Sequence, residues 1–179
     1  MLAGCTATLV AEGWHVVLPS RRHAPIPANE VRDGPPLPRT EQPRQALWVE
    51  TDWSNPVDLT KRAGRALGGP AELLIAWVHE EHRETVLRAV EPLLAATAAV
   101  VEVHNIGEGG RLTGFPEPIL RDHATQQVVL GYVRTGGRPR WLNQAEIADG
   151  VLAAVRRALA GRPSARHQVG AARSFAVRA

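Results

Sequence analysis

Basic and polar side chains follow the first expected strand of this chain, at Ser20, Arg21 and Arg22. A guanidinium group binds phosphate through paired donors and can also stack on an aromatic base. At this position of a nucleotide-binding sheet, an acid suits a free ribose 2′-hydroxyl and an arginine accommodates a 2′-phosphate. We therefore expect these residues to bind a dinucleotide, with NADP favoured over NAD. The alternative is a solvated basic turn.

Asp52 and Trp53 follow the next expected strand. The carboxylate can accept a hydrogen bond from an adenine amino group, and the indole can pack on the adenine ring. We therefore include both residues in the expected cofactor site. The alternative for Asp52 is that it caps the helix that begins at residues 54–56.

Three more strand ends carry side chains that could carry a proton, and these are His79, His104 and Tyr132. We take them as candidate catalytic residues, although a histidine in such a place can also be a polar residue satisfied by backbone. The seven histidines form no HxH or HxxxH pair, so the sequence predicts no metal site.

The elements that must position these side chains follow from periodicity and cap residues. Helices are expected over residues 2–12, 54–67, 81–94 and 143–160, and strands over residues 15–19, 46–51, 73–78, 99–103 and 127–133. Such alternation implies right-handed crossovers and an open parallel sheet. The expected fold class is therefore α/β, a Rossmann-like, doubly wound sheet in a three-layer α/β/α arrangement.

The chain of 179 residues has the size and composition of one soluble domain, with 44% apolar and 22% charged residues. We expect this domain over residues 1–160, with a proline-rich irregular loop at 23–45. A C-terminal tail over residues 161–179 would add a short edge strand or stay loose.

Composition also bears on location and partners. Cys5 is the single cysteine, which excludes an intramolecular disulfide and favours a reducing cytoplasm. The sequence has no apolar run of about 18 residues, so no membrane association is expected. The net charge is +3, but Lys61 is the only lysine and the arginines are scattered. This bias towards arginine is more typical of a GC-rich coding sequence than of residues selected to contact phosphates. We therefore do not expect nucleic-acid binding.

Several segments resemble the short-chain dehydrogenase/reductase superfamily, and in particular its small Rossmann-like members. They are Met1-Leu2-Ala3-Gly4, Glu12-Gly13-Trp14-His15-Val16, Leu74-Ile75-Ala76-Trp77-Val78-His79, and the run from Val129 through Gly137 to Ile147. The resemblance implies an NAD(P)-binding oxidoreductase acting on a small-molecule substrate, and it is compatible with a homo-oligomer. It adds Met1, Leu2, Trp77 and His79 to the expected cofactor-binding residues.

Two departures from that family bear on structure and function. In the family, a strand and a glycine-rich loop precede the Met-Leu pair, so we expect a sheet that lacks its first strand and a truncated N-terminus. The Val16–Leu18 strand would then pair with the Leu73–Val78 strand or with another chain. The family's catalytic tyrosine and lysine are four residues apart, but Gly136 stands four residues after Tyr132. The expected function is therefore NAD(P) binding without the usual catalytic pair, and the alternative is a non-catalytic Rossmann scaffold or a nucleotide-sensing protein.

Overall fold

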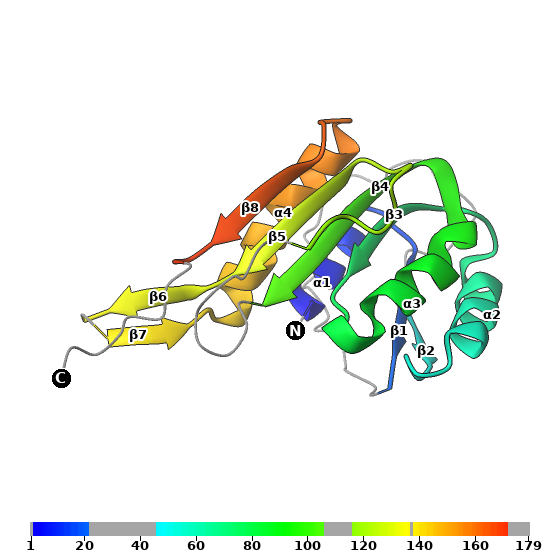
Figure 1. Cartoon of the computed structure of the whole chain (residues 1–179), viewed down its shortest axis with the longest axis horizontal. Helices are drawn as coiled ribbons and strands as arrows, with labels where there is room; N and C mark the ends of the chain where they lie inside the picture. The colour runs from blue at the N-terminus through cyan, green and yellow to red at the C-terminus, as the bar shows by residue number, and fades with distance from the viewer. Residues whose placement is uncertain (1, 22–45, 106–115, 137, 172–179) are drawn as a thin grey trace.

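A computed structural model describes residues 2–21, 46–105, 116–136 and 138–171 (Figure 1). Two of the expected cofactor-binding residues, Met1 and Arg22, lie outside these ranges. So does the proline-rich loop at 23–45, together with most of the loop expected at 105–122.

The described residues contain four α-helices: α1 (Ala3–Ala11), α2 (Pro56–Leu67), α3 (Glu80–Val90) and α4 (Gln144–Leu159). All four were expected, but α3 ends before the expected residue 94, where β4 already begins. The Asn55 side chain accepts a hydrogen bond from the amide of Asp58 at the start of α2. At the start of α4, Asn143 and Glu146 form a reciprocal capping box. The helix α3 stops at Val90, and a single 3-10 turn (Glu91–Leu93) containing Pro92 follows it.

The main sheet is parallel and has the strand order β3-β4-β5-β8. Its strands are β3 (Ala71–Ala76), β4 (Leu94–Asn105), β5 (Thr125–Leu130) and β8 (Ala165–Val169). The expectation of an α/β fold with a parallel sheet is thus confirmed, and the arrangement is compatible with a Rossmann-like fold. β8 lies within residues 161–179, so part of the expected tail pairs with the sheet.

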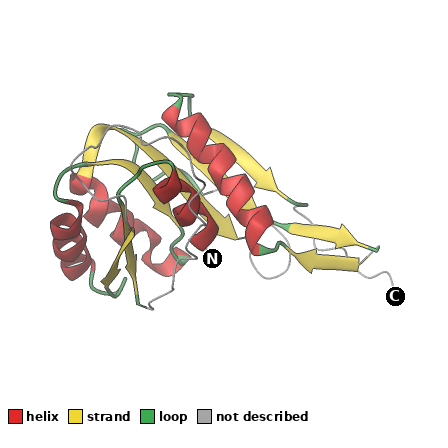
Figure 2. Cartoon of the chain, turned by 180° about the vertical axis from the view of Figure 1, so that it is seen from behind, coloured by secondary structure: helices red, strands yellow, loops and turns green. Residues whose placement is uncertain are grey.

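Two further strand pairs stand beside this sheet. β1 (Val16–Ser20) and β2 (Ala46–Glu50) are parallel and form a sheet of their own. β6 (Tyr132–Thr135) and β7 (Arg138–Trp141) form an antiparallel hairpin. The hairpin extends from the end of the molecule opposite to β1 and β2 (Figures 1 and 2).

Some strand boundaries differ from the sequence prediction. The expected strand over 127–133 is two strands, because after Gly131 the chain leaves the main sheet and Tyr132 bonds to Ala171 instead. Of the two pairings expected for β1, the one with β3 is wrong for the described residues, since β1 pairs with β2 and β3 pairs with β4. Pairing of β1 with another chain stays a prediction.

Helices pack on both faces of β4, which runs through the middle of the main sheet. Val101 and Val103 belong to a core that includes Leu9 of α1 and Val151 of α4. Val100, which directly precedes Val101, packs instead with Leu87 of α3. This alternation follows from the two-residue period of a strand.

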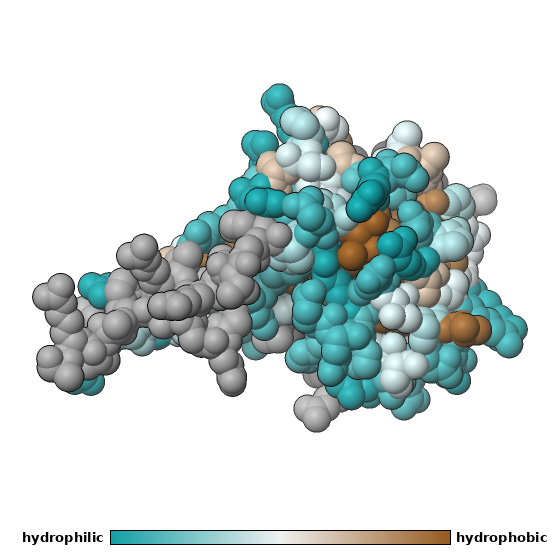
Figure 3. Space-filling view, viewed as in Figure 1, coloured by the Kyte–Doolittle hydropathy of each residue, from teal (hydrophilic) through white to brown (hydrophobic). Residues whose placement is uncertain are grey.

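The surface seen in Figure 3 is mostly hydrophilic, with small hydrophobic areas near α2 and α3. Val57 of α2 is the most exposed large apolar side chain recorded among the described residues. None of the described helices is long and apolar enough to cross a membrane.

Candidate functional site

Three side chains from three successive strand ends meet at one edge of the molecule. The guanidinium carbon of Arg21, just after β1, lies 5.8 Å from the centroid of the Trp53 ring. The Trp53 ring, shortly after β2, is 5.6 Å from the ring of His79, which precedes α3. The sequence predicted all three residues as cofactor-binding, and the structure brings them together. We call Arg21, Trp53 and His79 the strand-end cluster.

Trp53 anchors the strand-end cluster. It is half-buried and packs against the small core formed by Leu59 of α2 with Val86 and Val90 of α3. Arg21 and His79 are both exposed. An indole fixed in this way offers a rigid aromatic surface to a planar ligand.

Asp52 lies next to the strand-end cluster, and its carboxylate organises the turn that leads into α2. Oδ1 accepts a hydrogen bond from the amide of Ser54 at 3.0 Å, while Asn55 caps the helix itself. The amide of Ser54 lowers the pKa of Asp52, and the charge of Arg21 acts in the same direction. Asp52 is therefore an exposed carboxylate with a structural contact.

Other expected cofactor residues lie near these strand ends but not in the cluster. Ser20 is the last residue of β1 and is in register with Glu50 of β2. Trp77 and Leu2 pack against the core of α1 and α4. Their side chains therefore support the sheet.

Tyr132 and His104 make their recorded contacts outside the strand-end cluster. Tyr132 opens the β6–β7 hairpin and packs edge-on against Trp141, with ring centroids 5.0 Å apart. His104 is the penultimate residue of β4, where its Nε2 lies 3.5 Å from Oε2 of Glu102. That separation allows electrostatic attraction but is too long for a normal hydrogen bond.

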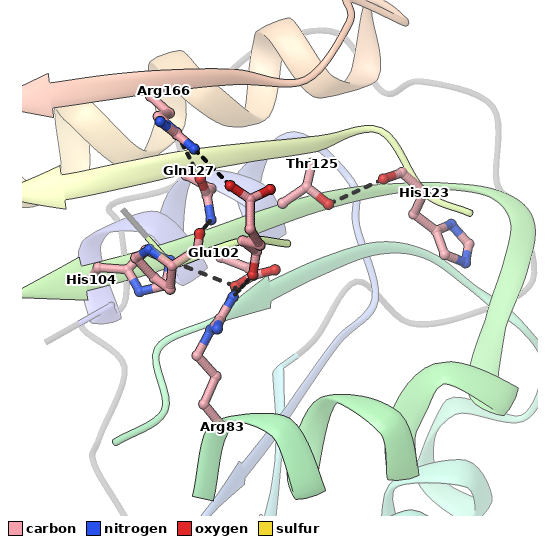
Figure 4. Close-up of polar contacts among 9 residues, drawn as sticks. Arg83, Glu102, His104, His123, Thr125, Gln127 and Arg166 are labelled. Carbon is pink, nitrogen blue, oxygen red and sulfur yellow. Dashed lines mark hydrogen bonds and ion pairs between the residues drawn. The ribbon is translucent and has the colours of Figure 1, made fainter. Parts of the chain in front are cut away.

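His104 lies beside a buried cluster of charged and polar side chains that the sequence analysis did not predict. Arg83 of α3 donates from Nε to Glu102 Oε2 at 2.9 Å, and both side chains are almost completely buried (Figure 4). Nη2 of Arg83 also donates to Glu102 Oε2, and it donates to the carbonyl oxygen of Glu117 at 2.8 Å. Beside it, Gln127 of β5 donates to the carbonyl of Pro116 at 2.7 Å. Arg83, Glu102 and Gln127 thus hold the chain at residues 116 and 117 onto the sheet.

Opposing effects set the ionisation of Glu102. Burial raises its pKa, but His104 and Arg83 together outweigh burial and leave the pKa below its ordinary value. Glu102 Oε1 has no hydrogen-bond partner and is fully buried, as is His104 Nε2. Together they line a cavity of about 10 Å³, the size of one water molecule.

The sequence did contain a signal for this group. Glu102 interrupts the apolar run from Ala98 to Val103, and a glutamate inside a buried strand requires a cationic partner. The position of that partner could not be read from periodicity.

In the described part of the chain, no three His, Cys, Asp or Glu side chains gather closely enough to hold a metal ion. Comparisons with protein-family models, curated proteins and solved structures find no match for this chain.

Proposed function

We propose that this chain is an NAD(P)-binding protein of the short-chain dehydrogenase/reductase type, with a three-layer, doubly wound sheet and a preference for NADP. The observation that carries the proposal is the contact of Arg21 with Trp53 and of Trp53 with His79 at three strand ends. In open parallel sheets, ligands bind beyond the carboxyl ends of the strands.

The chemistry of the strand-end cluster fits an adenosine phosphate. Arg21 lies over the Trp53 ring within the range of a cation–π contact, and its guanidinium N–H donors would bind phosphate oxygens. The Trp53 ring would offer the adenine a surface to stack on, with the tilted His79 ring beside it. Asp52 would orient the adenine amino group from the adjoining turn.

The strand order supports the same location. From β1 the chain proceeds to β2 on one side, and from β3 it proceeds through β4 and β5 on the other. A ligand crevice is expected where the direction reverses, between β1 and β3. α1 also begins there: Leu2 borders the space between these strands, and the first turn of the helix has neither a side-chain cap nor an acidic residue. Its amide groups would suit a pyrophosphate.

Catalysis is a separate part of the proposal. As an enzyme, the protein would be an NADP-dependent oxidoreductase that works on a small molecule in the cytoplasm, with His79 as the proton carrier nearest to the expected cofactor. The alternative is a non-catalytic scaffold or nucleotide sensor. It is favoured by the position of Tyr132, whose ring packs against Trp141 in the distant hairpin, and of Lys61, which is exposed on α2.

Calorimetric titration with NADPH, NADP, NADH and NAD tests the binding proposal. We expect the phosphorylated pair to bind more tightly, and we expect Arg21→Ala to remove most of that preference. Arg65→Ala is the matched control, because Arg65 is an exposed arginine at the far end of α2. Binding of none of the four nucleotides would overturn the proposal, and equal binding of all four would overturn the preference for NADP.

Turnover separates the enzyme from the sensor. NADPH oxidation is followed optically with a panel of aldehydes and ketones. Consumption that His79→Gln reduces supports the oxidoreductase, whereas tight binding without consumption supports the sensor.

A further inference from the structure

A small cavity lies between β4 and α3. Its volume is about 10 Å³, which is room for one water molecule. Three polar residues line it, Arg83 of α3 with Glu102 and His104 of β4. The other lining residues are apolar: Ala76, Val78, Leu87 and Val103. A molecule in this cavity would therefore find its hydrogen-bond partners among the three polar side chains.

Two atoms of these side chains have no hydrogen-bond partner within the described ranges. They are Oε1 of Glu102 and Nε2 of His104, and both are fully buried. A buried polar atom without a partner is costly, and an internal water commonly satisfies such atoms in proteins. One water in the cavity would satisfy both atoms at once, by donating to Oε1 and accepting from Nε2–H.

The positions of the two side chains on β4 explain why they meet. Glu102 and His104 are two residues apart and so share one face of the strand, the face from which Val100 packs against α3. His104 and Arg83 both point toward the Glu102 carboxylate (Figure 4). Arg83 Nε donates to Oε2 at 2.9 Å, which leaves Oε1 as the carboxylate oxygen that still needs a donor.

The charge of Glu102 decides which nitrogen of His104 carries a hydrogen. Burial raises the pKa of Glu102, but His104 and Arg83 outweigh burial and lower it, so the carboxylate is ionised near neutral pH and can only accept. Nε2 of His104 lies 3.5 Å from Oε2, where an unprotonated nitrogen would set one lone pair against another. Nε2 therefore carries a hydrogen in the neutral ring, and Nδ1 is the nitrogen that can bind and release a proton.

The surroundings of His104 place this nitrogen at the carboxyl end of the main sheet. In the described part of the chain, the charged side chains that line the cavity beside His104 are Glu102 and Arg83. β3 contributes Ala76 to the cavity, and the residue of β5 in register with His104 is Val129. Because Nε2 is fully buried, the 9% exposure of the His104 side chain belongs to its other atoms. Open parallel sheets bind their ligands at this end.

We propose that Glu102 and one internal water hold His104 as a positioned base at the carboxyl end of β4. Nε2–H of His104 donates to the water and faces Oε2 of Glu102, the water donates to Oε1, and Nδ1 takes up the exchangeable proton. Glu102 is thus a positioning residue that acts through His104, as a buried carboxylate does when it holds an imidazole in one tautomer. The inference goes beyond nucleotide binding and does not depend on it.

Imidazole ¹⁵N NMR of the full chain, without nucleotide, tests the proposal. The chain supplies a reference for each neutral tautomer, because an oxygen that only accepts requires a hydrogen on the nitrogen that faces it. Nε2 of His167 lies 2.7 Å from Oε1 of Gln126, whereas Nδ1 of His123 lies 3.2 Å from the carbonyl oxygen of Ala98. The variant His104→Gln assigns the signals of His104 by their loss.

We expect neutral His104 to match His167, with a visible Nε2–H signal, magnetisation transfer from that hydrogen to a bound water, and proton uptake at Nδ1 as pH falls. A ring that still carries a hydrogen on Nδ1 at about pH 9 would overturn the proposal, whether or not Nε2 is also protonated. So would an Nδ1 that takes up no proton before the chain unfolds in acid.

A crystal structure at high resolution tests the water directly. Density within hydrogen-bond distance of both Glu102 Oε1 and His104 Nε2 is expected, and a dry cavity would contradict the proposed arrangement.

The double variant Arg83→Met/Glu102→Leu tests the positioning role of Glu102, because it removes the carboxylate without leaving an unpaired charge. We expect the Nε2–H hydrogen of His104 to exchange with solvent at least about tenfold faster, while that of His167 is unchanged. Unchanged exchange at His104 would show that Glu102 does not position the ring. The measurements on the parent chain decide the proposal even if this variant fails to fold.

Discussion

Arg83 of α3 and Glu102 of β4 form a buried ion pair with a 2.9 Å contact between Nε and Oε2. Their side chains are 7% and 2% exposed. A pair removed from water in this way depends on both partners, since each charge is costly to bury alone.

We predict that Arg83→Met lowers the free energy of unfolding by about 3–5 kcal/mol, because it leaves the Glu102 carboxylate buried without its cation. The double variant Arg83→Met/Glu102→Leu should recover part of this loss, since it buries no charge. Urea denaturation measures both changes.

The matched control for this pair is Arg88→Met on the same helix. Arg88 pairs with Glu84, but both side chains are more than half exposed, so we expect a change below about 1 kcal/mol. A loss in Arg83→Met no larger than that of Arg88→Met would contradict the assigned role of the buried pair.

A second prediction concerns stability in acid. Arg140 donates to both carboxylate oxygens of Glu146, and with the amide of Asn143 it lowers the pKa of Glu146 from 4.5 to about 2. The pKa of Glu102 is also lowered. A depressed pKa contributes stability that is complete above the ordinary value and is lost as pH falls through the folded-state value. We therefore expect Tm to fall between about pH 4.5 and pH 2.

The variant Arg140→Gln isolates the Glu146 contribution. It should be less stable than the parent chain at pH 6 and should show a shallower fall in Tm over the acidic range. Calorimetry as a function of pH gives both curves. Parallel curves for the two proteins would show that the pair between Arg140 and Glu146 does not shape the acid transition.

Local sequence signals predicted the ends of α2 and α4 well, but α3 ends at Val90 rather than at the expected residue 94. Asn55 and Asn143 cap the starts of α2 and α4, and the left-handed glycines Gly68 and Gly161 follow their ends, near the expected bounds of 54–67 and 143–160, because such signals depend on only a few neighbouring residues. Strand pairing was harder to predict because it depends on distant parts of the chain. The turn of the chain at Gly131 into a hairpin, for example, involves Ala171.

The candidate site was also predicted only in part from the sequence. The rule that ligands bind at strand ends selected Arg21, Trp53 and His79 from sequence, and they are in contact. The same rule selected Tyr132, which lies elsewhere because its strand is not part of the main sheet. Arg83 was overlooked because a charged residue on an amphipathic helix is normally solvated.

A third prediction concerns the contact between α4 and β8. A Cβ added at Gly150 would lie 2.3 Å from Cγ2 of Val169 and 3.1 Å from its Cγ1. Gly150→Ala should therefore destabilise the protein, although alanine is favoured over glycine in a helix by about 1 kcal/mol. Val169→Ala removes both clashing methyl groups, so the double variant should be more stable than the sum of the two single changes predicts.

Gly64→Ala in α2 is the control for this helix substitution. Its added Cβ meets only the far end of the Leu93 side chain, at 3.1 Å, which can move aside. We expect this variant to be neutral or slightly stabilised in thermal unfolding. A Gly150→Ala protein as stable as Gly64→Ala would contradict the close packing of α4 on β8.

The last prediction separates the role of Trp53 from that of Arg21. If the indole stacks on adenine, Trp53→Leu should weaken all four dinucleotides alike, by about 1–3 kcal/mol, because every one of them carries the same base. Arg21→Ala should act on the 2′-phosphorylated pair alone. Trp48→Leu on β2 is the control, since Trp48 is a partly exposed tryptophan, at 36%, on the strand before the strand-end cluster. Titration of the three variants with NADPH and NADH gives the comparison. If Trp53→Leu binds NADPH and NADH as tightly as Trp48→Leu does, the indole of Trp53 is not part of the nucleotide site. Any contribution of Arg21 to binding would then not depend on its contact with Trp53.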